Sequence, residues 1–400
     1  MAHEFPTTAD AITNEWLSSV LGAEVTGFTA TFLEGGVLAD AFKLHSIMYA
    51  GNPVDAPSAV VIKVPNAVKE RREMAIANNA YLKEVSFFRD LAQHVPVRSP
   101  KLYGCFTDGT HACASFIIVM EDLSTHSKVF DQVDDTPDVA FARKIALEAA
   151  AMHAKFWESD TTMLPWIGRA DGRYVFAFDG ASRMANVAWP EFLRLWHQMY
   201  GQDFFHGEPD GEFEELVVLL TGPKCGGITD RIYDVLSSRP KTLLHGDMRA
   251  DNIFRTHPER VKSAEESTLT FIDWQAVHAG PPGPEFAQAF FNSLEPEVRR
   301  HDRDILREYH VRLVTLNPDA ASYTYDKLIE DYALSMCFWM TAIVTIGAGT
   351  LPIFDRPEGA RMKLLWEKGA VRAKAAMREL DCLSRVRHLA EGLPDDPPLT

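Results

Sequence analysis

The sequence predicts a two-lobed α+β protein, with an antiparallel sheet and a helix in a small N-terminal lobe and a larger, mostly helical C-terminal lobe. Strand-like alternation in the first third of the chain and helical periodicity after residue 123 lead to this prediction. The length of 400 residues, 46% of them hydrophobic, is sufficient for two lobes. We expect the N-lobe over residues 1–122, the C-lobe over 123–392 and a disordered tail over 393–400.

Several partner classes are disfavoured by the composition. With 40 basic and 56 acidic residues, the formal net charge of −16 argues against nucleic acid or an anionic membrane surface as a partner. The five cysteines are scattered without a CxxC pair, so neither a disulfide framework nor a zinc site is indicated, and a cytoplasmic location is expected. No signal peptide is expected from the first residues. The sequence leaves the oligomeric state open.

One uncharged segment, residues 333–349, needs to be distinguished from a membrane span. It is shorter than the roughly 20 residues that a helix needs to cross the hydrocarbon layer. It also contains Ser335, Thr341, Thr345 and two glycines. We therefore expect a buried core helix and no membrane partner.

The elements of the N-lobe follow from periodicity and turn residues. A helix is expected over 12–21, because its apolar residues recur at helical spacing and Gly22 follows as a stop. Three strands and a long helix follow, and a further strand closes the lobe; the expected ranges are 25–33, 42–49, 59–64, 70–94 (helix) and 115–120.

The C-lobe is expected to consist mainly of helices. Thr136 and Pro137 resemble an N-cap and a first-turn proline. The helices are expected over 136–157, 190–200, 212–220, 229–236, 296–317, 325–345 and 359–391. The segment Gly280–Glu285 is too rich in proline for a regular helix, and we expect helix to resume near Phe286.

The most specific motif lies among short strands at 242–244, 253–254 and 269–272. Asp247 precedes Asn252 by five residues, and Asp273 ends the next strand. Kinases use this constellation for phosphoryl transfer: the first Asp orients the attacking hydroxyl, and the Asn and the second Asp hold Mg²⁺. Any one of these residues alone is more often a turn or a cap; the conjunction indicates a site.

Lys63 supports the same interpretation, because it is the single polar residue in the apolar strand 59–64. A lysine flanked by β-branched residues needs an anion nearby. Nucleotide phosphates would provide it, and Glu84 in the following helix would hold the lysine. Glu70 and Glu73 are alternative partners, and a solvent-facing lysine is the simpler interpretation without the downstream motif.

Weaker signals surround this motif. Gly35 and Gly36 between two strands can bring backbone N–H groups close to phosphates, although such turns are common in β proteins. Arg249 is expected either to stabilise charge at the γ-phosphate, or to pair with Asp251 or lie at the surface. Glu285 is expected to support the catalytic loop.

An acidic stretch, Asp203–Glu215, has two interpretations. It can line a pocket for an amine, or it can be a solvated loop and helix face. The second interpretation is favoured, because runs of acidic residues are usually solvated.

Together these residues resemble the aminoglycoside phosphotransferase and choline kinase superfamily, small-molecule kinases with a protein-kinase-like fold. The resemblance rests on His245-Gly246-Asp247 with Asn252 and on Ile272-Asp273-Trp274-Gln275. It spans residues 12–345 and is greatest to the ecdysteroid-kinase-like (CHK kinase-like) branch and related bacterial phosphotransferases, through the segments 12–17, 119–123 and 151–154.

The resemblance implies ATP or GTP bound between the lobes, with contacts to the base from the backbone of Met120, Glu121 and Asp122. Two departures are visible: Glu285 stands where the family usually has Asp, and segment 257–267 is longer than usual. The Trp-Gln pair after Asp273 disfavours a protein kinase.

We therefore expect a kinase that transfers the γ-phosphate to a hydroxyl of a small molecule. Asp247 and Arg249 would be catalytic, Lys63 and Glu84 would position the nucleotide, and Asn252 and Asp273 would bind Mg²⁺. The alternatives are an aminoglycoside phosphotransferase that confers antibiotic resistance, and a catalytically idle nucleotide-binding protein.

Overall fold

The computed structural model describes residues 5–33, 38–110, 113–167, 188, 190–192, 194–195, 198, 211–351, 356 and 359–396, with the backbone alone for 340–346 and 348–350. The chain divides into two compact units. The first contains Met1–Lys128, Phe254–Lys262 and Ser267–Val277, and the second contains the remainder. Two late segments thus belong to the first unit, so the division is not a single cut after residue 122.

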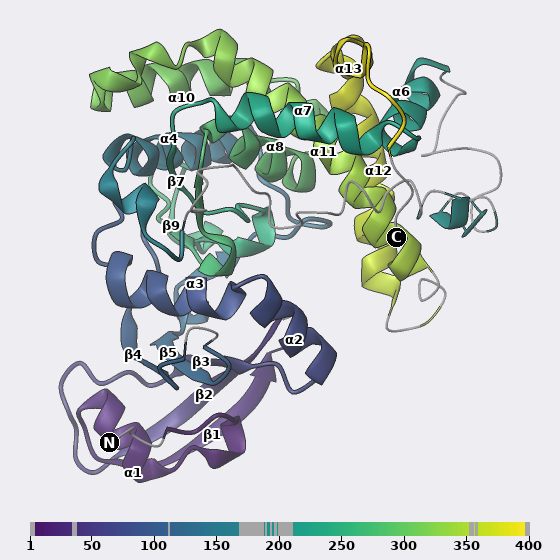
Figure 1. Cartoon of the computed structure of the whole chain (residues 1–400). Helices are drawn as coiled ribbons and strands as arrows, with labels where there is room; N and C mark the ends of the chain where they lie inside the picture. Colours follow the sequence, from purple (N-terminus) through teal and green to yellow (C-terminus); the bar gives the residue numbers. More distant parts are fainter. Residues whose placement is uncertain are drawn as a thin grey trace. The chain divides into compact units, whose positions relative to one another are not determined.

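A five-stranded antiparallel sheet forms the centre of the first unit (Figure 1). Its order is β1-β2-β3-β5-β4. Strand β4 is an edge strand that the sequence did not predict, because its residues are all half-buried and show no alternation. The bounds are Val25–Leu33 (β1), Ala39–Tyr49 (β2), Val60–Pro65 (β3), Leu102–Thr107 (β4) and Phe116–Glu121 (β5).

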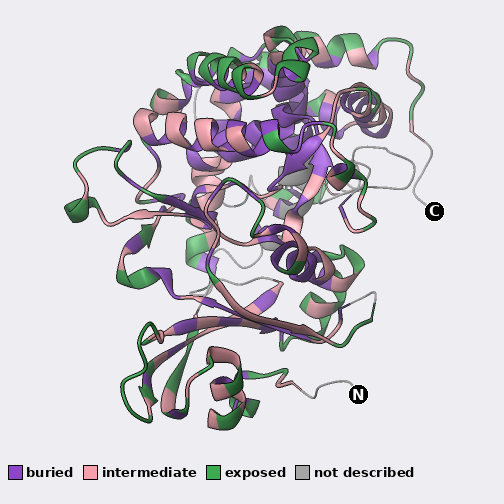
Figure 2. Cartoon of the chain, turned by 90° about the vertical axis from the view of Figure 1, so that its left-hand side faces the viewer, coloured by how far each residue is buried: buried purple, intermediate pink, exposed green. Residues whose placement is uncertain are grey.

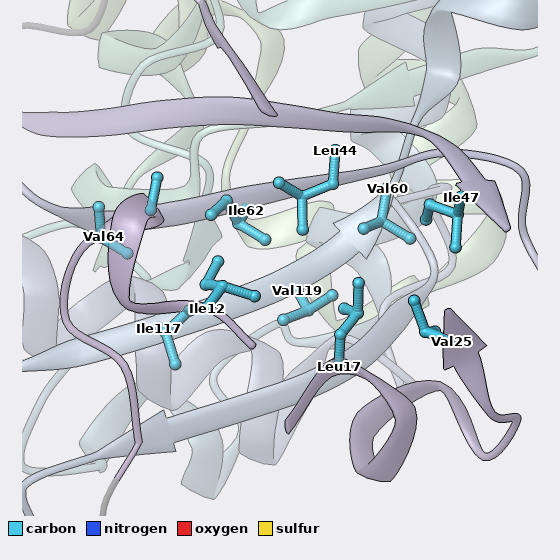
Figure 3. Packing of buried hydrophobic residues seen from close by; sticks show 11 residues of the cluster. Ile12, Leu17, Val25, Leu44, Ile47, Val60, Ile62, Val64, Ile117 and Val119 are labelled. Atoms are coloured by element: carbon cyan, nitrogen blue, oxygen red, sulfur yellow. The ribbon is translucent and has the colours of Figure 1, made fainter. Parts of the chain in front are cut away.

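One face of this sheet packs against helix α1 (Asn14–Leu21). The helix is capped by the Thr13 hydroxyl, which accepts from Trp16 N at 3.2 Å, and ends at Gly22 with φ 68°. Figure 3 shows Leu17 beside the buried residues of the strands, among them Val60 and Ile62. Because side chains alternate along a strand, Lys63 projects to the other face.

The helix expected over 70–94 is broken into three pieces. They are α2 (Lys69–Ala77), α3 (Ala80–Ser86) and a π-helical turn, η2 (Phe87–Leu91). Asn79 lies between α2 and α3 with φ 55°, a left-handed conformation that asparagine tolerates better than most residues. The apolar residues recur at helical spacing across the break, so the sequence predicted a single helix.

A second, three-stranded sheet has the order β6-β8-β9. Its strands are Ser127–Val129 (β6), Ile253–Thr256 (β8) and Leu269–Phe271 (β9). Short 3-10 turns accompany them at Leu123–Thr125 (η3), Pro258–Arg260 (η6) and Trp274–Ala276 (η7).

Helices dominate the second unit, which confirms the predicted α+β class. Most of these helices bury one face: in α10 (Asp302–Leu316), Ile305, Tyr309 and Leu313 are buried while Arg303 and Val311 are exposed, and Figure 2 shows this division in other helices. The bounds are Val139–Lys155 (α4), Gly211–Thr221 (α6), Cys225–Ser237 (α7), Pro282–Ser293 (α8), Pro296–Arg299 (α9), Asp302–Leu316 (α10), Tyr325–Thr350 (α11), Ala360–Glu379 (α12) and Cys382–Ala390 (α13), with strands Thr242–Leu244 (β7) and His278–Gly280 (β10).

Two of the predicted long helices are interrupted. The range 296–317 contains α9 and α10, and the range 359–391 contains α12 and α13, separated by Asp381 with φ 52°. The cap of α4 is Asp138, whose carboxylate accepts from Phe141 N, and not Thr136. Of the helix expected over 190–200, five residues lie outside the described residues, and the six described ones are helical.

The expectation of a disordered tail does not hold for residues 393–396. Asp396 accepts hydrogen bonds from Gly226 N (2.7 Å) and Gly227 N (2.9 Å) in the first turn of α7. A carboxylate at a helix N-terminus satisfies free N–H groups and interacts favourably with the helix dipole. Residues 397–400 lie outside the described residues.

Within the part of the chain that the structure describes, no helix is both long and apolar enough to span a membrane. In the uncharged segment, residues 333–339 of α11 are buried, as a core helix requires.

Helices α8 and α11 approach closely at Gly283. A Cβ built there would lie 2.5 Å from Asp331 Cβ and 2.7 Å from Tyr332 N. Gly283→Ala is expected to destabilise the protein by about 1–3 kcal/mol, since backbone atoms cannot move aside cheaply. Urea denaturation measures the change.

Gly369→Ala in α12 is the matched control, because a Cβ there meets nothing within 4 Å. This variant should be neutral or more stable by up to about 1 kcal/mol, as expected for alanine in a helix. Equal destabilisation by both variants would contradict the close approach of α8 and α11.

Candidate active site

The loop that follows β7 carries the predicted catalytic Asp. Strand β7 pairs with β10, and Leu244 at its end is opposite His278. The chain then turns at Gly246, with φ 80°, where a side chain would be strained. Asp247 follows with its side chain 18% exposed.

Glu285 holds this turn from the first turn of α8. Its Oε2 accepts from His245 N and its Oε1 from Gly246 N, both at 2.8 Å, and His153 Nε2 lies 3.4 Å from Oε2. Only 1% of Glu285 is exposed. Burial acts to raise the pKa of this carboxyl, but His153 and the loop hydrogen bonds outweigh it, so the pKa is lowered. The predicted supporting contact exists with Glu at this position.

Helix α8 begins at Pro282, four residues earlier than expected. Pro281 is the N-cap, and Pro282 and Pro284 fall in the first turn. The first N–H groups of a helix have no partner within it, so proline loses nothing there. The early start places Glu285 on the helix, with its carboxylate against the loop.

Both carboxylate oxygens of Asp247 are held by amides. Gln288 Nε2 donates to Oδ1 at 2.6 Å, and Asn252 Nδ2 donates to Oδ2 at 3.0 Å. Gln288 was not among the residues that the sequence motifs pointed to. Its position three residues after Glu285 could have indicated that it faces the same loop, because residues at i and i+3 share a helix face.

Asn252 is fixed by a second bond, from Nδ2 to the backbone oxygen of Asp247 at 2.9 Å. Its amide nitrogen is thereby engaged, which leaves Oδ1 as the acceptor that a cation would use. Ser293 Oγ accepts from Ala250 N at 2.7 Å just before it. Glu285, Gln288 and Ser293 of α8 thus contact the loop at three successive points.

Arg249 lies beside Asp247, with Nε 3.4 Å from Oδ2. Asp251, its alternative partner, accepts from Gln132 N at 3.0 Å. Burial raises the pKa of Asp251, and Arg249 opposes this effect. The arginine is therefore close to the predicted base, whereas its role toward a phosphate stays a prediction.

In the first unit, Lys63 is held between two carboxylates. Its Nζ lies 2.8 Å from Oε1 and 2.7 Å from Oε2 of Glu84 and 2.6 Å from Oδ1 of Asp273. Of the three glutamates expected as possible partners of Lys63, Glu84 is the one that binds it. Glu73 is paired instead with Lys69, with 3.6 Å between Lys69 Nζ and Glu73 Oε1.

The electrostatics of this triad follow from burial. Burial lowers the pKa of Lys63, but Asp273 and Glu84 outweigh it and the pKa lies above its ordinary value. Burial raises the pKa of Glu84 to about 7, although Lys63 opposes the shift.

Asp273 adopts a left-handed conformation, φ 66° and ψ 59°, two residues after the end of β9. Its Oδ2 accepts from Gln275 Nε2 at 3.0 Å. The next residue, Trp274, is fully buried and stacks on Phe87 with ring centroids 3.9 Å apart. Its Nε1 donates to Phe271 O. This packing fixes the strained turn that presents Asp273.

Three other predicted nucleotide contacts lie at the end of β5. Met120 and Glu121 pair with β3, and Glu121 N donates to Lys101 O at 2.9 Å, so their backbones are already engaged. Asp122 follows the end of β5, and its carboxylate accepts a hydrogen bond from Ser124 N and forms an ion pair with Lys43. Contacts to a base from this segment stay a prediction.

The structure does not describe all of the predicted site residues. Gly35 and Gly36 lie outside the described residues, as do residues 203–210 of the acidic stretch. Glu215, at the end of that stretch, pairs with Arg387 at the surface. That contact is consistent with the solvated interpretation.

Each of the two predicted Mg²⁺ ligands carries an oxygen of the kind that Mg²⁺ prefers. Asn252 has an amide oxygen and Asp273 has a carboxylate, and the binding of Mg²⁺ by these residues stays a prediction. Among the described residues, no group of three or more His, Cys, Asp or Glu side chains could hold a metal. Magnesium in phosphoryl-transfer sites needs only one or two protein ligands, with phosphates and water completing the shell.

Comparison with known families gives one partial match. The family model DUF1679, described as "Uncharacterized oxidoreductase dhs-27", matches residues 223–377, and this family is ecdysteroid-kinase-like. The matched segment contains Asp247, Asn252, Asp273 and Glu285. No curated protein sequence matches the chain.

Solved structures with a similar arrangement include small-molecule kinases. An ethanolamine kinase from Plasmodium vivax is 13% identical (89% of this chain and 85% of that chain covered, TM-score 0.45). A GDP complex of aminoglycoside 2'-phosphotransferase-IIIa is 12% identical (86% and 94%, 0.47), and a choline kinase from Cryptosporidium parvum 9% identical (90% and 93%, 0.44).

Glu285→Gln tests the support of the loop. An amide places an N–H₂ against a backbone N–H donor, so we expect a loss of about 1–3 kcal/mol in the free energy of unfolding at pH 7. Because the folded pKa of Glu285 is lowered, its contribution is present above the unfolded value of about 4.5 and is lost as the pH falls through the folded pKa.

The measurement is urea denaturation between pH 3 and pH 7. The difference in stability between wild type and Glu285→Gln should shrink as the solution becomes more acidic. A constant difference across this range would show that the charge of Glu285 does not hold the loop.

Proposed function

We propose that this protein is a small-molecule kinase that transfers the γ-phosphate of ATP or GTP to a hydroxyl group. The observation that carries the proposal is Asp247, a partly exposed carboxylate whose two oxygens are oriented by the amides of Gln288 and Asn252. A base held in one orientation beside an oxygen ligand for a cation suits phosphoryl transfer, where positioning and charge supply most of the catalysis.

In the proposed reaction, Asp247 orients the acceptor hydroxyl. The hydroxyl oxygen forms a bond to the γ-phosphorus, the bond from that phosphorus to the β–γ bridging oxygen breaks, and the hydroxyl proton passes to Asp247. The products are a phosphate monoester and a nucleoside diphosphate. Arg249, 3.4 Å from Asp247, can stabilise charge on the transferred phosphoryl group.

The triad around Lys63 supports nucleotide binding. A lysine with a raised pKa stays charged at neutral pH, and Glu84 fixes it from α3. Phosphate oxygens would replace Asp273 as the second partner of Lys63, which frees the Asp273 carboxylate for Mg²⁺. Magnesium, held by Asn252 and Asp273, would neutralise charge on the phosphates.

An active enzyme is favoured over an idle one, because the polar side chains that the transfer needs are present, and Lys63, Asn252 and Asp247 are oriented by hydrogen bonds. The acceptor is a separate question. No contact among the described residues favours an aminoglycoside over other hydroxylated compounds. Mass-spectrometric detection of added phosphate on sterols, amino alcohols, aminoglycosides and macrolides would identify the acceptor.

Asp247→Ala tests the proposal directly. Turnover of Mg-ATP with the acceptor found in this screen should fall by about 10²–10⁴-fold, because the base is lost. The thermal shift produced by Mg-ATP should remain, since Asp247 does not hold the nucleotide in this proposal.

The exposed Asp234 in α7 gives the matched control. Asp234→Ala should retain both activity and the thermal shift. Full activity in Asp247→Ala would exclude Asp247 as the base, and the absence of a thermal shift in wild type would exclude nucleotide binding.

A further inference from the structure

Arg372 of α12 is almost completely buried, with 2% of its side chain exposed, and it contacts segments far away in the sequence. Its Nη1 donates to Asn292 O (2.6 Å) at the C-terminal end of α8. Its Nη2 donates to Gln132 O (2.7 Å) and to Glu295 Oε1 (3.0 Å). One guanidinium thus joins three segments of the second unit.

Gln132 connects this arginine to the catalytic loop. Its backbone N–H donates to Asp251 Oδ1 at 3.0 Å, and its side chain donates to Asn292 O at 3.0 Å. Asp251 lies in the turn Ala250–Asn252, which carries Asn252. From the other side, Ser293 at the end of α8 holds Ala250 N. Arg372 therefore binds both segments that hold this turn, namely Gln132 and the C-terminal end of α8.

A second arginine of α12, Arg361, binds Asp131, the residue before Gln132. Arg361 Nη2 lies 2.7 Å from Asp131 Oδ2, and Asp131 Oδ1 accepts from Val133 N and Asp134 N. Arg361 and Arg372 are eleven residues apart, close to three full helical turns, so they lie on one face of α12. The face toward residues 131–132 is thus lined by two cations.

The chemistry of the site favours arginine over a smaller cation. The planar guanidinium presents several donors in fixed directions and can serve two carbonyls and a carboxylate at once. Lysine offers one compact ammonium that cannot reach all three. Glu295 is also paired with Lys368 at 2.6 Å, so it keeps a partner when Arg372 is replaced.

We propose that Arg372 is a positioning residue, which fixes the turn Ala250–Asn252 through Gln132 and the end of α8 and so sets the orientation of Asn252. The role of Asn252 as a magnesium ligand rests on the function proposed above. The bracing of the turn does not depend on it, and the two can be tested separately.

Arg372→Met is the test variant, and Arg299→Met is its matched control. Arg299 is also a fully buried arginine, but its partners are Asp302 and Glu379, away from the catalytic loop. Hydrogen exchange of the peptide covering residues 245–254 is measured in both. We expect exchange to rise roughly tenfold or more in Arg372→Met and to stay within about twofold of wild type in Arg299→Met.

Arg372→Lys keeps the test valid if Arg372→Met does not fold. It should give an intermediate increase in exchange, because lysine restores part of the contact. Unchanged exchange of residues 245–254 in a folded Arg372 variant, or the same increase in Arg299→Met, would overturn the proposal.

The dependence of phosphate transfer on Mg²⁺ provides a second measurement. Arg372→Lys should lower kcat and raise the Mg²⁺ concentration needed for half-maximal rate, each by about tenfold, while the KM for ATP changes little. If wild type transfers no phosphate but the exchange results hold, the proposed function fails and the bracing by Arg372 stands. If Arg372→Lys keeps the wild-type Mg²⁺ dependence, Asn252 is not set by this contact.

Discussion

In the second unit, the position of the loop after β7 depends on one buried carboxylate, that of Glu285. Placing an ion in the interior is costly unless hydrogen bonds and an opposite charge or dipole compensate it. Here two consecutive N–H groups of the loop after β7 and His153 provide that compensation. The same bonds that satisfy Glu285 therefore determine where His245 and Gly246 lie.

Helix α8 extends this arrangement along the loop. Glu285, Gln288 and Ser293 face the loop at its start, at Asp247 and at Ala250. A helix is a rigid element, so three contacts from one helix fix the loop more precisely than contacts from separate loops would. Gly283 lets α8 approach α11, and Arg372 binds its last turn, which anchors the helix at both ends.

In the first unit, the charge of Lys63 is likewise compensated by groups of opposite charge. Lys63 sits between Glu84 and Asp273, and Trp274 stacks on Phe87 next to them. A lysine bound this way is charged and preorganised, which is what binding of phosphate requires. Burial is the main cause of the raised pKa of Glu84, and the charge of Lys63 opposes it.

The sequence by itself determined the α+β class, the strand that carries Lys63 and the spacing from Asp247 to Asn252. These features are local: alternation places Lys63 on the face opposite Val60 and Ile62, and the five-residue spacing allows Asn252 to reach Asp247. The tertiary structure alone decided the choice of Glu84 over Glu70 and Glu73, the contacts of Gln288 and Ser293, and the part played by Arg372. Such partners are selected by hydrogen-bond geometry at about 3 Å between distant segments, and local periodicity carries no information at that scale.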